Sequence, residues 1–125
     1  MVELLDHLDA LSMPRAICTG SGHQAVRKHM GEHGLLERFD TVVAHGDYAR
    51  GKPEPEPFLV TAARLNIEPA DCLVLEDSHN GVRAASAAGM MTIMVPDLLD
   101  ATDEIAGMCV RIADSLHDVR GLLRA

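Results

Sequence analysis

The 125-residue chain is poor in aromatic residues, with one Tyr, two Phe and no Trp. Its core must therefore be built from aliphatic side chains, which suits helices packed on a sheet. The chain also lacks a basic run or stripe, and its net charge of −8 disfavours nucleic acid as a partner. No apolar run approaches the roughly 18 residues of a membrane span. These absences argue against a nucleic-acid-binding protein and against a membrane protein.

Cysteine is scarce and has no metal-binding spacing. Cys18, Cys72 and Cys109 lie far apart in apolar segments, and no Cys-x-x-Cys is present. This pattern disfavours a zinc site. An odd number of separated cysteines in apolar runs predicts reduced core thiols in a cytoplasmic protein. The first twelve residues are acidic and amphipathic, which is not the pattern of a signal peptide.

Short apolar runs alternate along the chain with segments of helical spacing. Strands are predicted at residues 15–18, 41–44, 71–75, 91–95 and 109–112. Helices are predicted at residues 2–11, 23–33, 55–65, 81–88 and 115–123, with one helical turn at 103–107. Strands that alternate with helices predict an α/β fold with a doubly wound, mainly parallel, Rossmann-like sheet.

Two adjacent carboxylates, Glu76 and Asp77, directly follow the apolar run 73–75. Ligands of open α/β sheets bind beyond the carboxyl ends of the strands, and buried acids at such a place need a cation. Carboxylate oxygens suit Mg²⁺ in particular. The alternative is that Asp77 or Ser78 only caps the helix that begins near Gly81, which explains one residue but not the acid pair.

Two further polar segments fall beyond predicted strand ends. Thr19, Gly20 and Ser21 offer a hydroxyl and open amides of the kind that bind an anion. Taken alone, they are more typical of an ordinary capped turn. Lys52 lies in a stiff Gly-Lys-Pro segment that can aim its charge, although most loop lysines are merely solvated. A hydroxyl, a lysine and an acid pair at one sheet edge together predict phosphoryl transfer.

Two other phosphate-related patterns were weighed against this interpretation. Residues 46–52 match the start of a nucleotide-binding P-loop, but the next residue is Pro53 where Ser or Thr is needed. Pro53 and Pro55 also remove amides that a P-loop points at phosphate. A response-regulator receiver also uses acids, Thr and Lys, but there the acids come first and the lysine last. Both alternatives are set aside.

The ordered set of Thr19, Lys52 in G-K-P-x-P-E-x-F, and Glu76-Asp77-Ser78-x-x-Gly81 resembles the haloacid dehalogenase-like hydrolase superfamily. The resemblance is strongest to the branch with β-phosphoglucomutase and phosphoglycolate-phosphatase-like enzymes. It covers nearly the whole chain from about Pro14 onward. It implies a Mg²⁺-dependent phosphatase or phosphomutase that acts on a small phosphorylated metabolite through an aspartyl-phosphate.

The resemblance also implies roles for individual residues. Thr19 would hold a phosphate oxygen, helped by the amides of Gly20 and Ser21. Lys52 would neutralise the phosphoryl group and the nucleophile. Glu76 and Asp77 would bind Mg²⁺, and the loop that carries them would be shaped by Ser78 and Asn80.

One motif of the family is absent from the chain. The family's first strand ends in Asp-x-Asp, whereas no two aspartates here are spaced by two. By resemblance, residues 1–13 are the end of a cap and its linker helix, and residues 14–125 are a partial core domain without its first strand. The chain is therefore interpreted as a truncated hydrolase, inactive alone. Two carboxylates alone bind Mg²⁺ poorly, so an empty metal site is expected in such a fragment.

The missing strand would lie between the strand that ends at Thr19 and the strand that ends at Glu76. Its absence leaves two apolar edges that tend to pair. We expect the two strands to close up on each other, or another chain to fill the gap by self-association. The alternative function is a non-catalytic phosphate-binding or protein-interaction module derived from the same fold.

Overall fold

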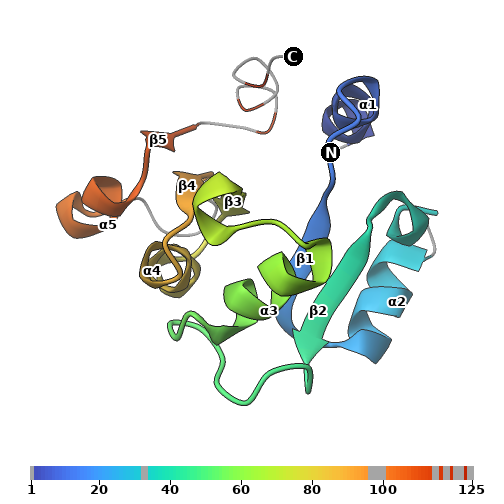
Figure 1. Ribbon diagram of the computed structural model, residues 1–125, viewed down its shortest axis with the longest axis horizontal. Coiled ribbons are helices and arrows are strands. Elements are labelled where there is room, and N and C mark those ends of the chain that lie inside the picture. The colour runs from blue at the N-terminus through green and yellow to red at the C-terminus, as the bar shows by residue number, and fades with distance from the viewer. Residues whose placement is uncertain are drawn as a thin grey trace.

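The computed structural model describes residues 2–31, 34–95 and 101–113, together with residues 116, 119 and 123. Strands and helices alternate along the chain, as the sequence predicted (Figure 1). The elements are α1 (Val2–Ala10), β1 (Ala16–Gly22), α2 (His23–Gly31), η1 (Leu36–Arg38), β2 (Thr41–His45), α3 (Glu56–Leu65), η2 (Pro69–Asp71), β3 (Leu73–Glu76), α4 (His79–Ala87), β4 (Met91–Met94), α5 (Asp103–Met108) and β5 (Arg111–Ile112).

The strands form two parallel sheets rather than one. The first sheet pairs β1 with β2, and the second has the order β3-β4-β5. Figure 1 shows the two groups of strands apart, and α3 packs against β1, β2 and α4. Parallel strands joined through helices confirm the predicted α/β class.

The prediction that β1 and β3 close up on each other is wrong, because these two described strands do not pair. Side-chain contacts connect the two strands instead. The carbonyl of Cys18 accepts a hydrogen bond from Lys52 Nζ instead of from a neighbouring strand. Side chains from α3 and α4, including Phe58 and Ala84, fill one cluster with Val74 of β3. The alternative, that another chain fills the gap, stays a prediction.

The core is aliphatic, as the shortage of aromatic residues requires. The largest fully buried side chains include Met94, Ile105, Val43 and Val82. Helix α1 buries Leu4 in a cluster with Ile93, so it packs on the second sheet. The cysteines are half-buried at the edges of the clusters rather than central, and those three described residues form no disulfide. No helix in the described part of the chain is long and apolar enough to cross a membrane.

The predicted bounds need correction mainly beside the polar segments. Strand β1 continues to Gly22, which pairs with His45, and the register is irregular between Cys18 and Gly22. Strand β3 begins at Leu73 because residues 69–71 form a 3-10 turn, and it includes Glu76. Helix α4 begins at His79 because Ser78 caps it. The last two residues of the helix predicted at 23–33 lie outside the described residues, and the remaining described elements differ from prediction by one or two residues at an end. The predicted helix at 115–123 lies largely outside the described residues.

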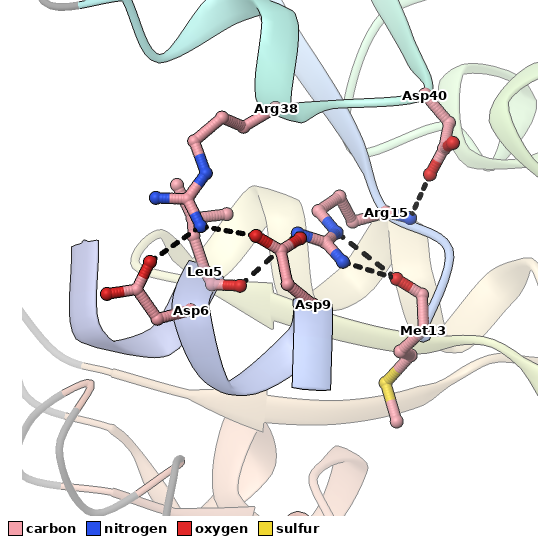
Figure 2. Close-up of polar contacts among 7 residues, drawn as sticks. All are labelled: Leu5, Asp6, Asp9, Met13, Arg15, Arg38 and Asp40. Carbon is pink, nitrogen blue, oxygen red and sulfur yellow. Dashed lines mark hydrogen bonds and ion pairs between the residues drawn. The ribbon is translucent and has the colours of Figure 1, made fainter. Parts of the chain in front are cut away.

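An ion-pair network attaches α1 to η1 and to the start of β1 (Figure 2). Arg38 lies 2.8 Å from Asp6 and 2.7 Å from Asp9, and Arg15 lies 2.5 Å from Asp9. The Arg15 guanidinium also donates to the Met13 carbonyl at 2.9 Å. The hydrogen bond from Arg38, and then that from Arg15, holds the pKa of Asp9 below its usual value. The network therefore stabilises the fold at pH values where Asp9 is ionised.

Replacing Asp9 by Asn should lower the midpoint of thermal unfolding at neutral pH by a small amount, because the pairs are solvent-exposed. The folded pKa is depressed, so this stabilisation is present above about pH 4, the unfolded value, and disappears as pH falls through the folded value. The unfolding midpoints of wild type and Asp9→Asn should therefore converge on acidification. Asp71→Asn, on η2, is the control, and a difference that persists in acid would contradict the prediction.

Candidate functional site

Lys52 connects Cys18 of β1 with Glu76, the last residue of β3, and these two strands belong to different sheets. Its Nζ lies 2.9 Å from Oε2 of Glu76 and donates to the Cys18 carbonyl at 3.2 Å. The same ammonium lies 4.9 Å from the centroid of the Phe58 ring. The side chains of Lys52 and Glu76 are 17% and 9% exposed. The structure therefore brings two of the predicted site residues into one shielded ion pair.

The loop that carries Lys52 is fixed on its N-terminal side. The Tyr48 hydroxyl donates to the Thr19 carbonyl at 2.9 Å, and the Glu56 carboxylate accepts hydrogen bonds from the amides of Ala49 and Arg50. The Lys52–Pro53 peptide bond is cis. The hydrogen bond from Tyr48 thus attaches the loop that carries Lys52 to the Thr19 segment.

The Glu76 carboxylate is engaged on both oxygens. Its Oε1 accepts hydrogen bonds from the Asp77 amide at 3.1 Å, the Ser78 amide at 3.3 Å and the Ser78 hydroxyl at 3.2 Å. Burial alone would raise the pKa of Glu76, but the Lys52 ammonium, and then hydrogen bonds with Asp77, hold it below its usual value. Glu76 is therefore a carboxylate at neutral pH, paired with an ammonium.

Helix α4 approaches Glu76 closely at Gly81. A Cβ on Gly81 would lie 2.0 Å from Cδ of Glu76, so no larger residue fits while Glu76 stays in place. Ser78 Oγ accepts the Gly81 amide at 3.0 Å and thereby caps the helix. Of the two residues expected to shape this loop, Ser78 contacts Glu76, whereas the Asn80 side chain accepts a hydrogen bond from Arg83.

The Thr19 segment forms the irregular part of β1. The Ser21 amide, which was expected to face a phosphate oxygen, donates to Thr19 Oγ1 at 3.1 Å. Thr19, Gly20 and the Lys52-bound Cys18 are consecutive in sequence, so this segment lies beside the ion pair. The phosphate-binding roles of Thr19, Gly20, Ser21 and Lys52 stay predictions.

Glu76 and Asp77 have the donor chemistry that Mg²⁺ prefers. They are adjacent at the end of β3, beside a glycine that leaves room for the Glu76 side chain. Residues 2–31, 34–95 and 101–113 contain no group of three or more His, Cys, Asp or Glu able to hold a metal ion. The acid pair thus fits Mg²⁺ as a partial set of ligands, and the remainder would be water, substrate or residues beyond those described.

Two residues of the site had no predicted role: Tyr48, whose hydroxyl donates to the Thr19 carbonyl, and Phe58, whose ring lies against Lys52. The available signal was their rarity, because Tyr48 is the chain's one tyrosine and lies in the same loop as Lys52. A second pair follows the end of β2: His23 Nε2 is 2.6 Å from Asp47 Oδ2. The Ala44 amide, then His23, lowers the pKa of Asp47. These contacts anchor the first residue of α2.

The protein has a parallel α/β fold with two carboxylates at the end of a strand and a lysine beside them. This arrangement is typical of enzymes that transfer phosphoryl groups. The sequence profile described as haloacid dehalogenase-like hydrolase matches residues 1–89. The chain belongs to this family, as the resemblance predicted.

Three comparisons show the range of relatives. The chain is 37% identical over 118 residues to a bifunctional riboflavin kinase/FMN phosphatase of Arabidopsis thaliana, covering 94% of this chain and 31% of that protein. It is 39% identical over 61 residues to a β-phosphoglucomutase of Bacillus subtilis, covering 49% of this chain and 27% of that protein. The crystal structure of CbbY from Rhodobacter sphaeroides in complex with phosphate superposes with a TM-score of 0.85 at 28% identity, covering 94% of this chain and 53% of that chain.

The chain therefore spans between about a quarter and a half of the length of these relatives. One of these relatives is named as a kinase and phosphatase, and another as a phosphomutase. The family and the α/β class predicted from the sequence are both confirmed.

Proposed function

We propose that these residues carry the lysine and acid-pair part of a Mg²⁺-dependent phosphatase or phosphomutase that acts on small phosphorylated metabolites. The observation that carries the proposal is Lys52, whose ammonium contacts the Cys18 carbonyl of β1 and Glu76 at the end of β3. A cation held beside this strand end suits the charge that develops on a transferring phosphoryl group. The phosphate bound to the similar CbbY structure supports this choice of ligand.

The roles proposed for the other residues follow their positions. Thr19 Oγ1 donates to a phosphate oxygen, with the amides of Gly20 and Ser21 nearby, and Ser21 then releases its bond to Thr19. Glu76 and Asp77 would hold Mg²⁺, which would neutralise charge on phosphoryl oxygens. Ser78 keeps Oε1 of Glu76 oriented.

The nucleophile is proposed to come from a strand between β1 and β3. Neither strand pairs on that side within the described residues, and the Cys18 carbonyl there is bound by a lysine. An aspartate of that strand would attack phosphorus and form an aspartyl-phosphate as the ester oxygen leaves. Water would then hydrolyse the acyl phosphate. Since the 125 residues contain no Asp-x-Asp, they are proposed to be inactive alone.

The remaining assignments are part of the same proposal. Residues 14–125 are proposed as a partial core domain and residues 1–13 as the helix and linker that follow a cap. A cytoplasmic location is proposed, in keeping with three half-buried cysteines that form no disulfide among the described residues. The unpaired sides of β1 and β3 favour self-association, or a non-catalytic interaction module as the second candidate function.

The test combines ligand binding with turnover. The 125-residue chain should bind inorganic phosphate weakly by ³¹P NMR, and Lys52→Met should reduce the affinity at least tenfold, because it removes the cation. The control is Lys28→Met, which removes the chain's other lysine, an exposed residue of α2. With Mg²⁺, the same chain should hydrolyse 4-nitrophenyl phosphate at the background rate.

Two outcomes would contradict the proposal. Phosphate that binds equally well to Lys52→Met would remove Lys52 from the site. Robust hydrolysis by the 125 residues that is lost in Lys52→Met would show that the nucleophile lies within them.

A further inference from the structure

We infer that Lys52 acts as a built-in competitor for the divalent cation, so that the acid pair binds a cation weakly until the lysine charge is neutralised. The inference rests on the proposed function only where it names phosphate as the neutralising anion. The competition is between the Lys52 ammonium and the divalent cation for the Glu76 carboxylate.

The first step is the contact between Lys52 and Glu76. Oε2 of Glu76 is 2.9 Å from the Lys52 ammonium, and Oε1 already accepts three hydrogen bonds from Asp77 and Ser78. A divalent cation that uses Glu76 must therefore share a carboxylate that is already in contact with a full positive charge. Both side chains are largely shielded from water, so the repulsion between the two cations is weakly screened.

The second step is that Lys52 is held in place from other directions. The Cys18 carbonyl accepts its hydrogen bond, and the ring of Phe58 lies 4.9 Å below the ammonium. Lys52 cannot move away from an incoming cation without losing both contacts. The positive charge is therefore a fixed feature of the acid-pair environment, and an anion that binds to Lys52 offsets it.

Replacing a residue of a binding site usually weakens binding, whereas replacing Lys52 is expected to strengthen the binding of a divalent cation. Neutralising Lys52 leaves the largely buried Glu76 carboxylate without a counter-charge. A divalent cation can supply that charge, so removing a proposed phosphate-binding residue should strengthen cation binding. A residue that only shapes the loop would not have this effect.

The experiment titrates Mn²⁺ into the 125-residue chain and follows paramagnetic broadening of the Asp77 and Ser78 amide signals by NMR. We expect Lys52→Met to lower the Kd for Mn²⁺ at least tenfold, and Lys28→Met to leave it unchanged. The double variant Lys52→Met/Glu76→Gln should lose the gain, because Glu76 is the carboxylate that Lys52 occupies.

Equal or weaker Mn²⁺ binding in Lys52→Met, or no detectable binding, would overturn the inference. If the amide spectrum shows that Lys52→Met does not fold, Lys52→Gln is titrated instead, since its side chain is uncharged but keeps a hydrogen-bond donor. The same two outcomes then apply.

A second titration separates this inference from the proposed function. Inorganic phosphate should tighten Mn²⁺ binding to the wild type and have little effect in Lys52→Met. If phosphate changes neither protein while Lys52→Met still gains Mn²⁺ affinity, the proposed phosphate site fails and the inference about Lys52 stands. If phosphate binds through Lys52 but Lys52→Met gains no Mn²⁺ affinity, the inference about Lys52 fails and the proposed phosphate site stands.

Discussion

Replacing Gly81 by alanine should lower the free energy of unfolding by about 2–4 kcal/mol and separate Lys52 from Glu76. The new Cβ would lie 2.0 Å from Cδ and 2.2 Å from Oε2 of Glu76, so the carboxylate has to move. Glu76 is 9% exposed and its oxygens bind Lys52, Asp77 and Ser78, so moving it breaks several contacts together. Denaturant unfolding followed by circular dichroism gives the change.

The chain offers a matched control for this substitution. Gly107 also lies in a helix, α5, but a Cβ there meets nothing within 4 Å. Gly107→Ala should be neutral or stabilise by up to about 1 kcal/mol, because alanine is the better helix former. Equal effects of the two substitutions would show that contact with Glu76 does not decide the outcome. An unchanged free energy of unfolding in Gly81→Ala would contradict the close approach itself.

Replacing Phe58 by alanine should cost about 3–5 kcal/mol of unfolding free energy. Phe58 is 5% exposed on α3, where it packs with Ala62, Val74 of β3 and Ala84 of α4, and Cys18 of β1 lies against the same cluster. Its loss leaves a cavity where the two sheets meet and removes the ring beside Lys52. Thermal and denaturant unfolding measure the cost.

The control for Phe58 is its neighbour Leu59, which is 42% exposed. Leu59→Ala should change the free energy of unfolding by about 0.5 kcal/mol or less, because surface substitutions rarely do more. Phe58→Leu should retain most of the stability, since it keeps much of the apolar volume. A small effect of Phe58→Ala, comparable with that of Leu59→Ala, would mean that this cluster does not hold the sheets together.

Much of the fold could be predicted because apolar periodicity reports which residues are buried. The alternation of short runs with helical spacing predicted the elements, and Ser78 was among the predicted caps. The extent of β1 could not be predicted, because Thr19 to Gly22 is a polar, glycine-rich segment that is equally compatible with a turn. Its extension depends on the pairing of Gly22 with His45, which is a tertiary contact.

The candidate site was predicted in composition but not in geometry. Their positions after predicted strands suggested that Lys52 and Glu76 lie at the edge of one sheet. The structure divides the strands between two sheets but still brings the two side chains to 2.9 Å. The sequence could not show that Cys18 offers its carbonyl to Lys52, because that depends on which neighbouring strand is present. Nor could it show that the Ser21 amide turns toward Thr19 Oγ1, a local choice among several hydrogen-bond acceptors.

The division into two sheets bears on the cooperativity of unfolding. Backbone hydrogen bonds run from β1 to β2 and from β3 through β4 to β5, but no described strand ladder crosses from β1 to β3. The contacts that connect the two sheets are made by side chains, chiefly those of the Phe58 cluster and of Lys52. Side-chain contacts of this kind are broken by local unfolding more readily than the backbone hydrogen bonds between paired strands. The β1–β2 and β3–β5 halves are therefore expected to behave as two separately protected units in amide exchange.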